Sequence, residues 1–362
     1  MFPCTIKVEK KPILCYNDEM TPNPDSVFEA AHTSQASDVH IAVGAPVLFR
    51  VSGELIAQKG KDLTQADVQG FVKKILGEAE YKTFEKNREV DVAYGLKSGA
   101  RLRINCHFEK GFPGLVARII PETIPQPEEV GLGHLEEHLL ELKDGLVLFT
   151  GPTGAGKSTS LAAVMQSINT KRAEHIVTME DPIEFIFPKG KSVIRQRQFG
   201  QDFLSFPEAL RRVLRQDPDI IMVGEMRDLE TIAAALTLAE TGHLIFATLH
   251  TPNAMQTVSR IVDVFPPHQQ TQIRTQLSLS LKMIVAQRLI PRKGGGRIAQ
   301  REVLVNNSAV ANIIRDNRIQ ELTSALQSGV ADGMCTFERH AKELYKQDLI
   351  EKETCKWAER DI

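Results

Sequence analysis

The chain has 362 residues, of which 42% are hydrophobic and 25% are charged, and its formal net charge at pH 7 is −2. This composition excludes a fully disordered chain and a collagen-like chain. The near-neutral charge gives no bulk indication of a nucleic-acid binder. No apolar run approaches the roughly 18 residues that cross a bilayer. The five cysteines form no C-x-x-C pair, which indicates reduced thiols and a cytoplasmic protein.

The first third of the chain divides into an extension and a small domain. Residues 1–24 are rich in proline and lysine without periodicity, which predicts a mobile N-terminal extension. Residues 25–120 combine short strand patterns, a turn signal at Ser52-Gly53 and a helical apolar stripe over 63–76. This mixture predicts a small α+β domain. In its last predicted hairpin, alternation over 101–108 puts arginines on one face and apolar side chains on the other.

A proline-rich segment separates this domain from the rest. Three prolines fall within residues 121–129, so we expect a stiff linker over 121–131. Short apolar runs then alternate with helical segments, which predicts an α/β domain over 132–300 with a parallel sheet covered on both faces. Residues 301–362 carry amphipathic patterns and predict a C-terminal helical cap. The apolar runs that predict the strands are 146–150, 175–179, 219–223 and 243–249.

A glycine-rich motif directly follows the first of these strands. The sequence from Gly151 to Ser158 matches G-x-x-x-x-G-K-[ST], in which glycines let backbone N–H groups turn inward around phosphate oxygens. Lys157 supplies a cation for the β- and γ-phosphates, and Ser158 supplies a hydroxyl for Mg²⁺. The helix that follows directs its positive N-terminus at the same anion. The predicted nucleotide-binding residues are Gly151, Pro152, Thr153, Gly154, Ala155, Gly156, Lys157, Ser158 and Thr159.

Acidic side chains follow the second and third predicted strands. The carboxyl ends of parallel strands gather at one edge of a doubly wound sheet, so these groups are expected to face the phosphates. Two of them also suit structural roles, because Asp228 can cap the next helix and Asp181 can shape a turn. The acidic residues are Glu180, Asp181 and Glu184 in the first cluster, and Glu225 and Asp228 in the second.

Two histidines bracket the fourth predicted strand. His243 and His250 are seven residues apart, which in a strand is a separation of about 20 Å. They therefore cannot contact the same phosphate. His250, at the carboxyl end, lies on the expected ligand edge, whereas His243 is expected to be structural.

Four ordered motifs resemble a known family. In order, they are similar to the Walker A, Asp-box, atypical Walker B and His-box motifs of secretion-superfamily ATPases of the GspE/PulE type. The resemblance is strongest to type IV pilus retraction ATPases (PilT/PilU-like), over about residues 25 to 350. The start of the α+β domain resembles the PAS-like N-terminal domain of this family. The four motifs are GPTGAGKSTSLAA, MEDPIEF, RQDPDIIMVGEMRDLET and AETGHLIFATLHT.

The resemblance implies a RecA-like P-loop ATPase domain behind a PAS-like domain, with ATP and Mg²⁺ as cofactors. It implies a hexameric ring motor, formed by this chain alone or as a hetero-ring with a paralogue, that couples ATP hydrolysis to pilus retraction and twitching motility. Such a motor would act on an inner-membrane platform protein from the cytoplasmic side. It would meet the membrane through partners only and bind no nucleic acid.

The resemblance also implies roles for single residues. Glu184 would be the base that activates water, Glu225 would lie near Mg²⁺, and His250 would sense the γ-phosphate. The residues alone leave open whether Glu184 or Glu225 polarises the water. The family uses arginines of the N-terminal domain across the ring interface. Arg101 and Arg103 are therefore the candidates for acting on the ATP of a neighbouring subunit.

One stretch departs from the family pattern. AVANIIRD (309–316) aligns with the retraction signature A-I-R-N-L-I-R-E, but Ala311 stands where the family has arginine. That signature is associated with retraction rather than hydrolysis, so a primary and an accessory retraction role both stay open. The other hypotheses are a pilus-assembly or type II secretion ATPase, an accessory ring that binds nucleotide without significant turnover, and a small-molecule kinase.

Overall fold

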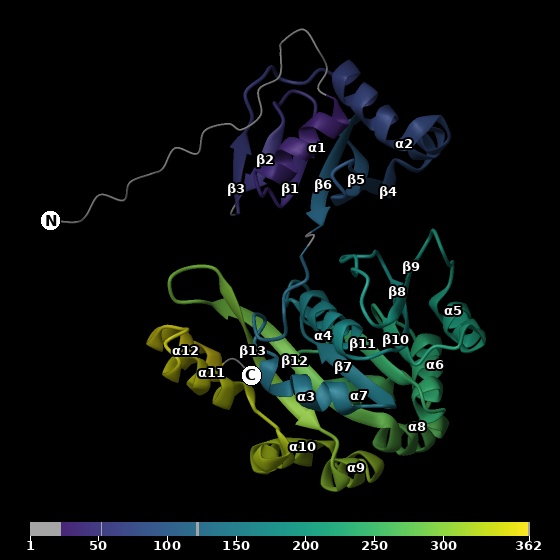
Figure 1. Ribbon diagram of the computed structural model, residues 1–362, viewed down its shortest axis with the longest axis vertical. Coiled ribbons are helices and arrows are strands. Elements are labelled where there is room, and N and C mark those ends of the chain that lie inside the picture. Colours follow the sequence, from purple (N-terminus) through teal and green to yellow (C-terminus); the bar gives the residue numbers. More distant parts are fainter. Residues whose placement is uncertain (1–22, 52, 121–122, 361–362) are drawn as a thin grey trace, which may run out of the picture. The chain divides into compact units, whose positions relative to one another are not determined.

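The computed structural model describes residues 23–51, 53–120 and 123–360, and the chain divides into two compact units between Thr123 and Ile124 (Figure 1). Residues 1–22 of the predicted extension, Ser52 of the predicted turn, and the first two residues of the predicted linker lie outside the described residues. Within the described ranges, no helix has both the length and the apolar character needed to cross a membrane.

The first unit is built on a six-stranded antiparallel sheet with strand order β3-β2-β1-β6-β5-β4. Its core combines apolar side chains from the sheet with those of two helices, among them Phe28, Phe49, Phe71 and Phe84. The predicted hairpin is present as β4 and β5. The elements are α1 (Pro24–Thr33), β1 (Asp38–Ile41), β2 (Leu48–Val51), β3 (Glu54–Ala57), α2 (Gln65–Asn87), β4 (Glu89–Gly95), β5 (Arg101–Glu109) and β6 (Phe112–Ile120).

Both helices of this unit differ from the sequence expectation. Pro24, which was expected to end the extension, is instead the first residue of α1. Asn23 caps this helix by accepting a hydrogen bond from the Asp25 N–H (3.3 Å), and proline at the first position has no N–H to leave unpaired. The helix predicted over 63–76 continues to Asn87 across a break at Gly77, whose φ is +70°.

The second unit is built on a seven-stranded mixed sheet with strand order β13-β12-β7-β11-β10-β8-β9. The four predicted strands form its parallel centre, and β9 lies at one edge (Figure 1). On the other side, β12 is parallel to β7, and β13 is antiparallel to β12. The strands are β7 (Gly145–Thr150), β8 (His175–Glu180), β9 (Val193–Gln198), β10 (Ile220–Val223), β11 (Leu244–Leu249), β12 (Leu281–Pro291) and β13 (Arg297–Val305).

Helices cover both faces of this sheet. Along β7, Leu146 and Leu148 pack into the cluster formed with α5 to α10, whereas Val147 and Phe149 pack with α3 and α4. This alternation confirms the predicted parallel centre covered on both sides. The helices are α3 (Gly133–Glu141), α4 (Lys157–Lys171), α5 (Phe206–Val213), α6 (Leu229–Glu240), α7 (Ala254–Asp263), α8 (Pro267–Ser280), α9 (Ser308–Arg315), α10 (Leu322–Ser328), α11 (Phe337–Lys346) and α12 (Lys352–Arg360).

The strands β9, β12 and β13 are not predicted from the sequence. The expected start of the helical cap at residue 301 falls inside β13, which continues to Val305, so the helices begin at Ser308. The strands β12 and β13 form a hairpin in which Gln287 and Gln300 are buried. These polar residues interrupt the apolar pattern that would indicate strands. The C-terminal helices α11 and α12 pack on the same hairpin around Ile290.

Candidate nucleotide site

The phosphate loop lies between β7, whose six residues are all buried, and α4. Gly151 has a φ of +141°, and a Cβ at this position would lie 2.1 Å from the Gln287 carbonyl oxygen of β12. Only glycine fits this close approach between the loop and the neighbouring strand. The Gln287 side chain also holds the loop, because its Nε2 donates a hydrogen bond to the Ala155 carbonyl (2.7 Å). The cradle is therefore set by backbone packing and one buried amide.

Lys157 begins α4 and is almost fully buried, with 8% of its surface exposed. Its Nζ donates hydrogen bonds to the carbonyl oxygens of Gly151 (2.7 Å) and Pro152 (3.1 Å) and lies 3.4 Å from His250 Nδ1. Burial lowers the pKa of Lys157, and the negative charges of Glu225 and other carboxylates oppose that shift. The ammonium thus lies inside the loop, at the position where a phosphate oxygen would meet it.

Glu225 follows β10, and both of its carboxylate oxygens have basic side chains as partners. Oε1 lies 3.0 Å from His250 Nε2, and Oε2 lies 2.8 Å from the Arg227 guanidinium. Partial burial acts to raise the pKa of Glu225, but Arg227 and His250 outweigh it, so the pKa lies below its ordinary value. The Met226 N–H donates to the Thr248 carbonyl (3.1 Å), which ties the end of β10 to the end of β11. This tie brings Glu225 and His250 together.

Glu184 lies on the loop that follows β8, and its side chain is exposed. Two amide side chains of β9 hold this loop. Gln196 donates through Nε2 to the Phe185 carbonyl (2.7 Å) and accepts from the Phe187 N–H (3.2 Å), and Gln198 accepts from the Ile183 N–H (3.3 Å). Glu184 is close enough to Lys157 for its charge to act on the Lys157 pKa. The structure therefore places Lys157, Glu184, Glu225 and His250 around one edge of the sheet.

The other acidic residues have structural partners. Glu180 is 6% exposed and accepts hydrogen bonds from Thr178 Oγ1 (2.6 Å) and Gln196 Nε2 (3.1 Å). Burial raises the pKa of Glu180 to about 6. The expectation that the whole first cluster faces the phosphates is therefore wrong for Glu180, whose carboxyl is held inside the unit. Asp228 caps α6 by accepting from the Thr231 N–H (2.8 Å), which confirms its predicted structural role.

Arg101 and Arg103 belong to β5 of the first unit. Arg103 is about half exposed and lies 3.9 Å from the Asp91 carboxylate on β4, and Arg101 is partly exposed at the start of the strand. Both residues project from the polar face of the strand, as predicted. Their action on a neighbouring subunit stays a prediction.

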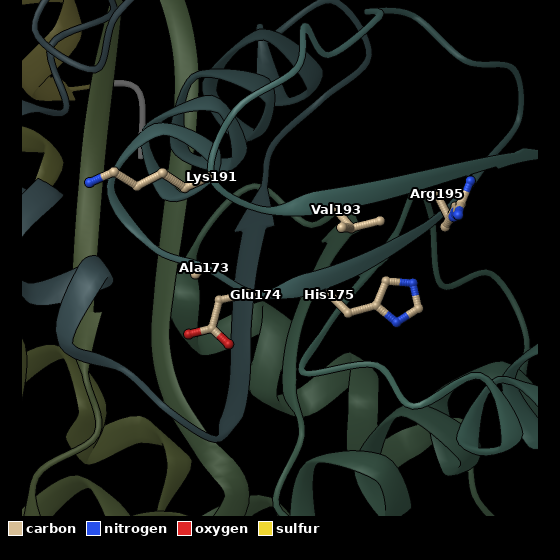
Figure 2. A pocket seen from close by; sticks show the side chains of 6 residues that line it. All are labelled: Ala173, Glu174, His175, Lys191, Val193 and Arg195. Carbon is tan, nitrogen blue, oxygen red and sulfur yellow. The ribbon is translucent and has the colours of Figure 1, made fainter.

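A cavity of about 400 Å³ opens at the opposite end of β8 (Figure 2). His175 is the first residue of β8, whereas Glu180 at the far end is adjacent to the loop that carries Glu184, which we call the acidic loop. Glu174 in this cavity already pairs with Arg172 (2.6 Å). The cavity is therefore separate from the phosphate edge of the sheet. Its lining residues are Ala173, Glu174, His175, Lys191, Val193 and Arg195.

Sequence reasoning did not identify Gln287, Gln196 or Arg227 as site residues. Arg227 bridges two acidic side chains, because it also lies 3.7 Å from Asp181. Its place within the third motif could have drawn attention to it. A glutamine inside the apolar run of β12 is an unusual buried polar residue, which is the one sequence signal for Gln287. No local signal distinguishes Gln196, because its role depends on the pairing of β9 with β8.

Comparison with known proteins agrees with this geometry. Residues 126–354 match the family model described as Type II/IV secretion system protein. The chain is 42% identical to the "Type IV pilus retractation ATPase PilT" of Pseudomonas aeruginosa, across 89% of this chain and 93% of that protein. It is 43% identical to a "Twitching motility protein" of Neisseria gonorrhoeae, across 89% of this chain and 86% of that protein.

A solved structure is similar over nearly the whole chain. It is the crystal structure of the pilus retraction motor PilT with bound ADP, with a TM-score of 0.86 and 40% identity, covering 94% of this chain and 98% of that chain. The α/β arrangement of the second unit is therefore that of a P-loop ATPase fold. The chain belongs to the Type II/IV secretion system protein family and is similar within it to the pilus retraction ATPases.

Proposed function

We propose that this chain hydrolyses ATP and uses the energy to retract type IV pili, which drives twitching motility. The observation that carries the proposal is the meeting of Lys157, Glu225 and His250 at the phosphate loop, beside the loop of Glu184. These are the groups that phosphoryl transfer to water needs: a cation on the phosphates, an acid near the metal and a base for the water. The identity to PilT supports the retraction role.

Nucleotide binding in this proposal rests on the loop and α4. The loop amides and the N-terminus of α4 bind the phosphates. Lys157 Nζ gives up its hydrogen bonds to the loop carbonyl oxygens and donates to phosphate oxygens instead. The Ser158 hydroxyl and the Glu225 carboxylate are the oxygen donors that Mg²⁺ prefers. Within the described residues no group of His, Cys, Asp and Glu side chains forms a metal centre of its own. Mg²⁺ would take its other ligands from phosphates and water, and would neutralise charge on the γ-phosphoryl group.

Glu184 is the water-activating base in this proposal. Glu225 is bound by His250 and Arg227, and the pKa of its carboxyl is held low, which makes it a weaker proton acceptor. Glu184 is exposed on the adjacent loop, where a water molecule can reach it. His250 lies between Lys157 and Glu225, so a change at the γ-phosphate that moves His250 would also change its contact with the Glu225 carboxylate.

The same proposal gives the chain a place in a larger machine. We infer a hexameric ring, alone or with a paralogue, with a PAS-like first unit, a RecA-like second unit and a C-terminal helical cap. It acts from the cytoplasm on a platform protein of the inner membrane. In this ring Arg101 and Arg103 would contact the ATP of a neighbouring subunit. An arginine inserted at the γ-phosphate raises the rate of hydrolysis by about 10³–10⁵-fold.

A mixing experiment tests the arginines. Subunits with Arg101→Ala and Arg103→Ala would be combined with Lys157→Ala subunits, each of which is expected to be inactive alone. Mixed interfaces then pair an intact arginine set with an intact phosphate loop, so some ATP turnover should return. Failure to recover turnover at every mixing ratio would contradict action between subunits.

Gene deletion with complementation tests the function itself. A deletion strain with excess surface pili and no twitching supports retraction, whereas bald cells would support the assembly hypothesis. In parallel, the purified chain with MgATP and no acceptor should release phosphate. Tight binding without turnover would favour the accessory ring, and acceptor-dependent ADP release would favour a kinase. Complementation by a chain with Ala311→Arg measures whether the family arginine changes the retraction output.

A further inference from the structure

Arg301 of β13 is a buried cation that the proposed reaction does not use. Only 1% of its surface is exposed, and no carboxylate of the described residues pairs with it at ion-pair distance. Its Nε has no hydrogen-bond partner in the structure. Burial lowers its pKa to about 10, so the guanidinium is still charged at neutral pH. A charge buried without a counter-ion costs free energy, and an apolar residue of similar size would often be as stable or more stable.

The guanidinium joins two segments that are far apart in the sequence. One terminal nitrogen donates to the Val130 carbonyl (2.6 Å) and to Ser160 Oγ (3.1 Å), and the other donates to the Gly131 carbonyl (3.2 Å). Ser160 lies in the first turn of α4, directly after the predicted phosphate-binding residues. Val130 and Gly131 lie at the end of the proline-rich segment, inside the second unit, which begins at Ile124.

The surroundings of Arg301 keep this arrangement in place. Gly131 has a φ of +73°, and a Cβ there would lie 3.1 Å from the guanidinium, so glycine permits the close approach. The Arg301 backbone N–H donates to His340 Nδ1 of α11 (2.9 Å). On the opposite face of β13, Glu302 accepts from the Ala254 N–H at the start of α7 (2.9 Å). One short stretch of β13 thus contacts the first turn of α4 and the start of α7.

We propose that Arg301 is a positioning residue that couples the phosphate-binding helix α4 to the segment over residues 126–132, near the start of the second unit. The inference rests on the proposed function, because it assumes that nucleotide binds at the N-terminus of α4. A movement of α4 on nucleotide binding carries Ser160 with it. The Arg301 nitrogen that donates to both Ser160 Oγ and the Val130 carbonyl then transmits the movement to the segment over residues 126–132. Charge-assisted hydrogen bonds are strong enough to transmit such a displacement.

Hydrogen exchange of the purified full-length chain, with and without MgADP, tests this coupling. In the wild-type chain, MgADP should slow exchange of the amides over residues 126–132 by about fivefold or more, in the range of ordinary coupling between sites. Arg301→Met keeps the length and apolar stem of the side chain. We expect it to bind MgADP within about threefold of wild type, comparable to a single hydrogen bond, and to lose the exchange response.

Two further variants separate coupling from packing. Ser160→Ala removes only the contact with α4, so it should weaken the response without unfolding the chain. Arg301→Lys keeps the charge but cannot span three acceptors with one ammonium, so it should restore the response only in part. Arg260→Met, at an exposed position of α7, is the matched control and should respond like wild type. A purely structural role would instead lower the melting temperature and leave the exchange response intact.

The outcomes distinguish this proposal from the proposed function. If MgADP does not bind to the wild-type chain, the nucleotide site itself is wrong. If MgADP binds but the amides over 126–132 do not respond, or if Arg301→Met and Ser160→Ala respond like wild type, the coupling role of Arg301 is wrong while the nucleotide site stands.

Discussion

The phosphate loop after β7 and the acidic loop after β8 lie at the same edge of one sheet, yet they are held in different ways. The phosphate loop packs on the backbone of β12, a strand inside the sheet, through the close approach at Gly151. The acidic loop is held by the side-chain amides of Gln196 and Gln198, which come from the edge strand β9. The proposed phosphate-binding loop is therefore held by the core of the sheet, whereas the position of the proposed base depends on a few hydrogen bonds at the sheet edge.

This difference predicts that turnover can be removed without loss of binding. Glu184→Gln replaces the proposed base by an amide of the same shape. We expect MgATP turnover to fall by about 10²–10⁴-fold, the usual contribution of a general base, with nucleotide affinity within about twofold. Steady-state phosphate release and equilibrium binding measure the two effects. Glu137→Gln, exposed on α3, is the control. Normal turnover in Glu184→Gln would show that Glu184 is not the base that activates water and would favour Glu225 instead.

The acidic side of the site should also make stability depend on pH. Burial raises the pKa of Glu180 to about 6 in the folded chain, above its ordinary value of 4.5. The folded state then binds this proton more tightly than the unfolded state, so the free energy of unfolding falls as the pH rises through this window. The expected loss above pH 6 is about 2 kcal/mol, since one pKa unit corresponds to about 1.4 kcal/mol.

Glu180→Gln should remove this particular loss. Urea unfolding at pH 4.5 and pH 7.5 measures the difference for both chains, and the wild-type chain should lose more stability between the two values than the variant. An equal change in both chains would show that the Glu180 carboxyl is not the titrating group.

On the phosphate side, Gln287→Met should weaken binding rather than turnover. The substitution removes the donor to the Ala155 carbonyl and leaves that buried oxygen without its partner, which costs about 1–3 kcal/mol. We expect MgADP affinity to fall about tenfold or more, with turnover at saturating ATP little changed. Calorimetric titration provides the measurement. Gln272→Met, at an exposed position of α8, controls for the exchange of glutamine for methionine.

On the acidic side, Gln196→Met should give the opposite pattern. Loss of its bonds to the Phe185 carbonyl and the Phe187 N–H loosens the loop of Glu184. We expect turnover to fall about threefold to tenfold, the scale of one or two net hydrogen bonds, with MgADP affinity unchanged. Gln216→Met, exposed after α5, is the control. A reduction in affinity with normal turnover would contradict the division between the two loops.

Local features of the sequence predicted one part of this molecule well. The glycines and Lys157 of the phosphate loop, the four central strands and the cap at Asp228 all depend on residues close together in the chain. The polarity of β11 also follows from its sequence, which places His250 rather than His243 at the ligand edge. In each case the chemistry and the local backbone conformation are specified by the same short segment.

Contacts between distant segments could not be predicted in the same way. Gln287 and Ala155 are 132 residues apart, and Arg301 and Ser160 are 141 residues apart. Polar residues inside β12 and β13 also obscured the apolar pattern that would have predicted these strands. The start of α1 was missed although Asn23 and Pro24 form an ordinary helix-start signal, because the proline-rich context favoured an extension.

The pairing of β9 with β8 has a consequence for the charge around the loop of Glu184. Gln196 and Gln198 are two residues apart, so both point to the same side of the strand, and Arg195 and Arg197 point to the other. A slip of one residue along β8 would therefore exchange two neutral amides for two guanidinium groups beside Glu184. The alignment of a single outer strand thus keeps the two guanidinium groups of β9 away from the carboxylate of the proposed base.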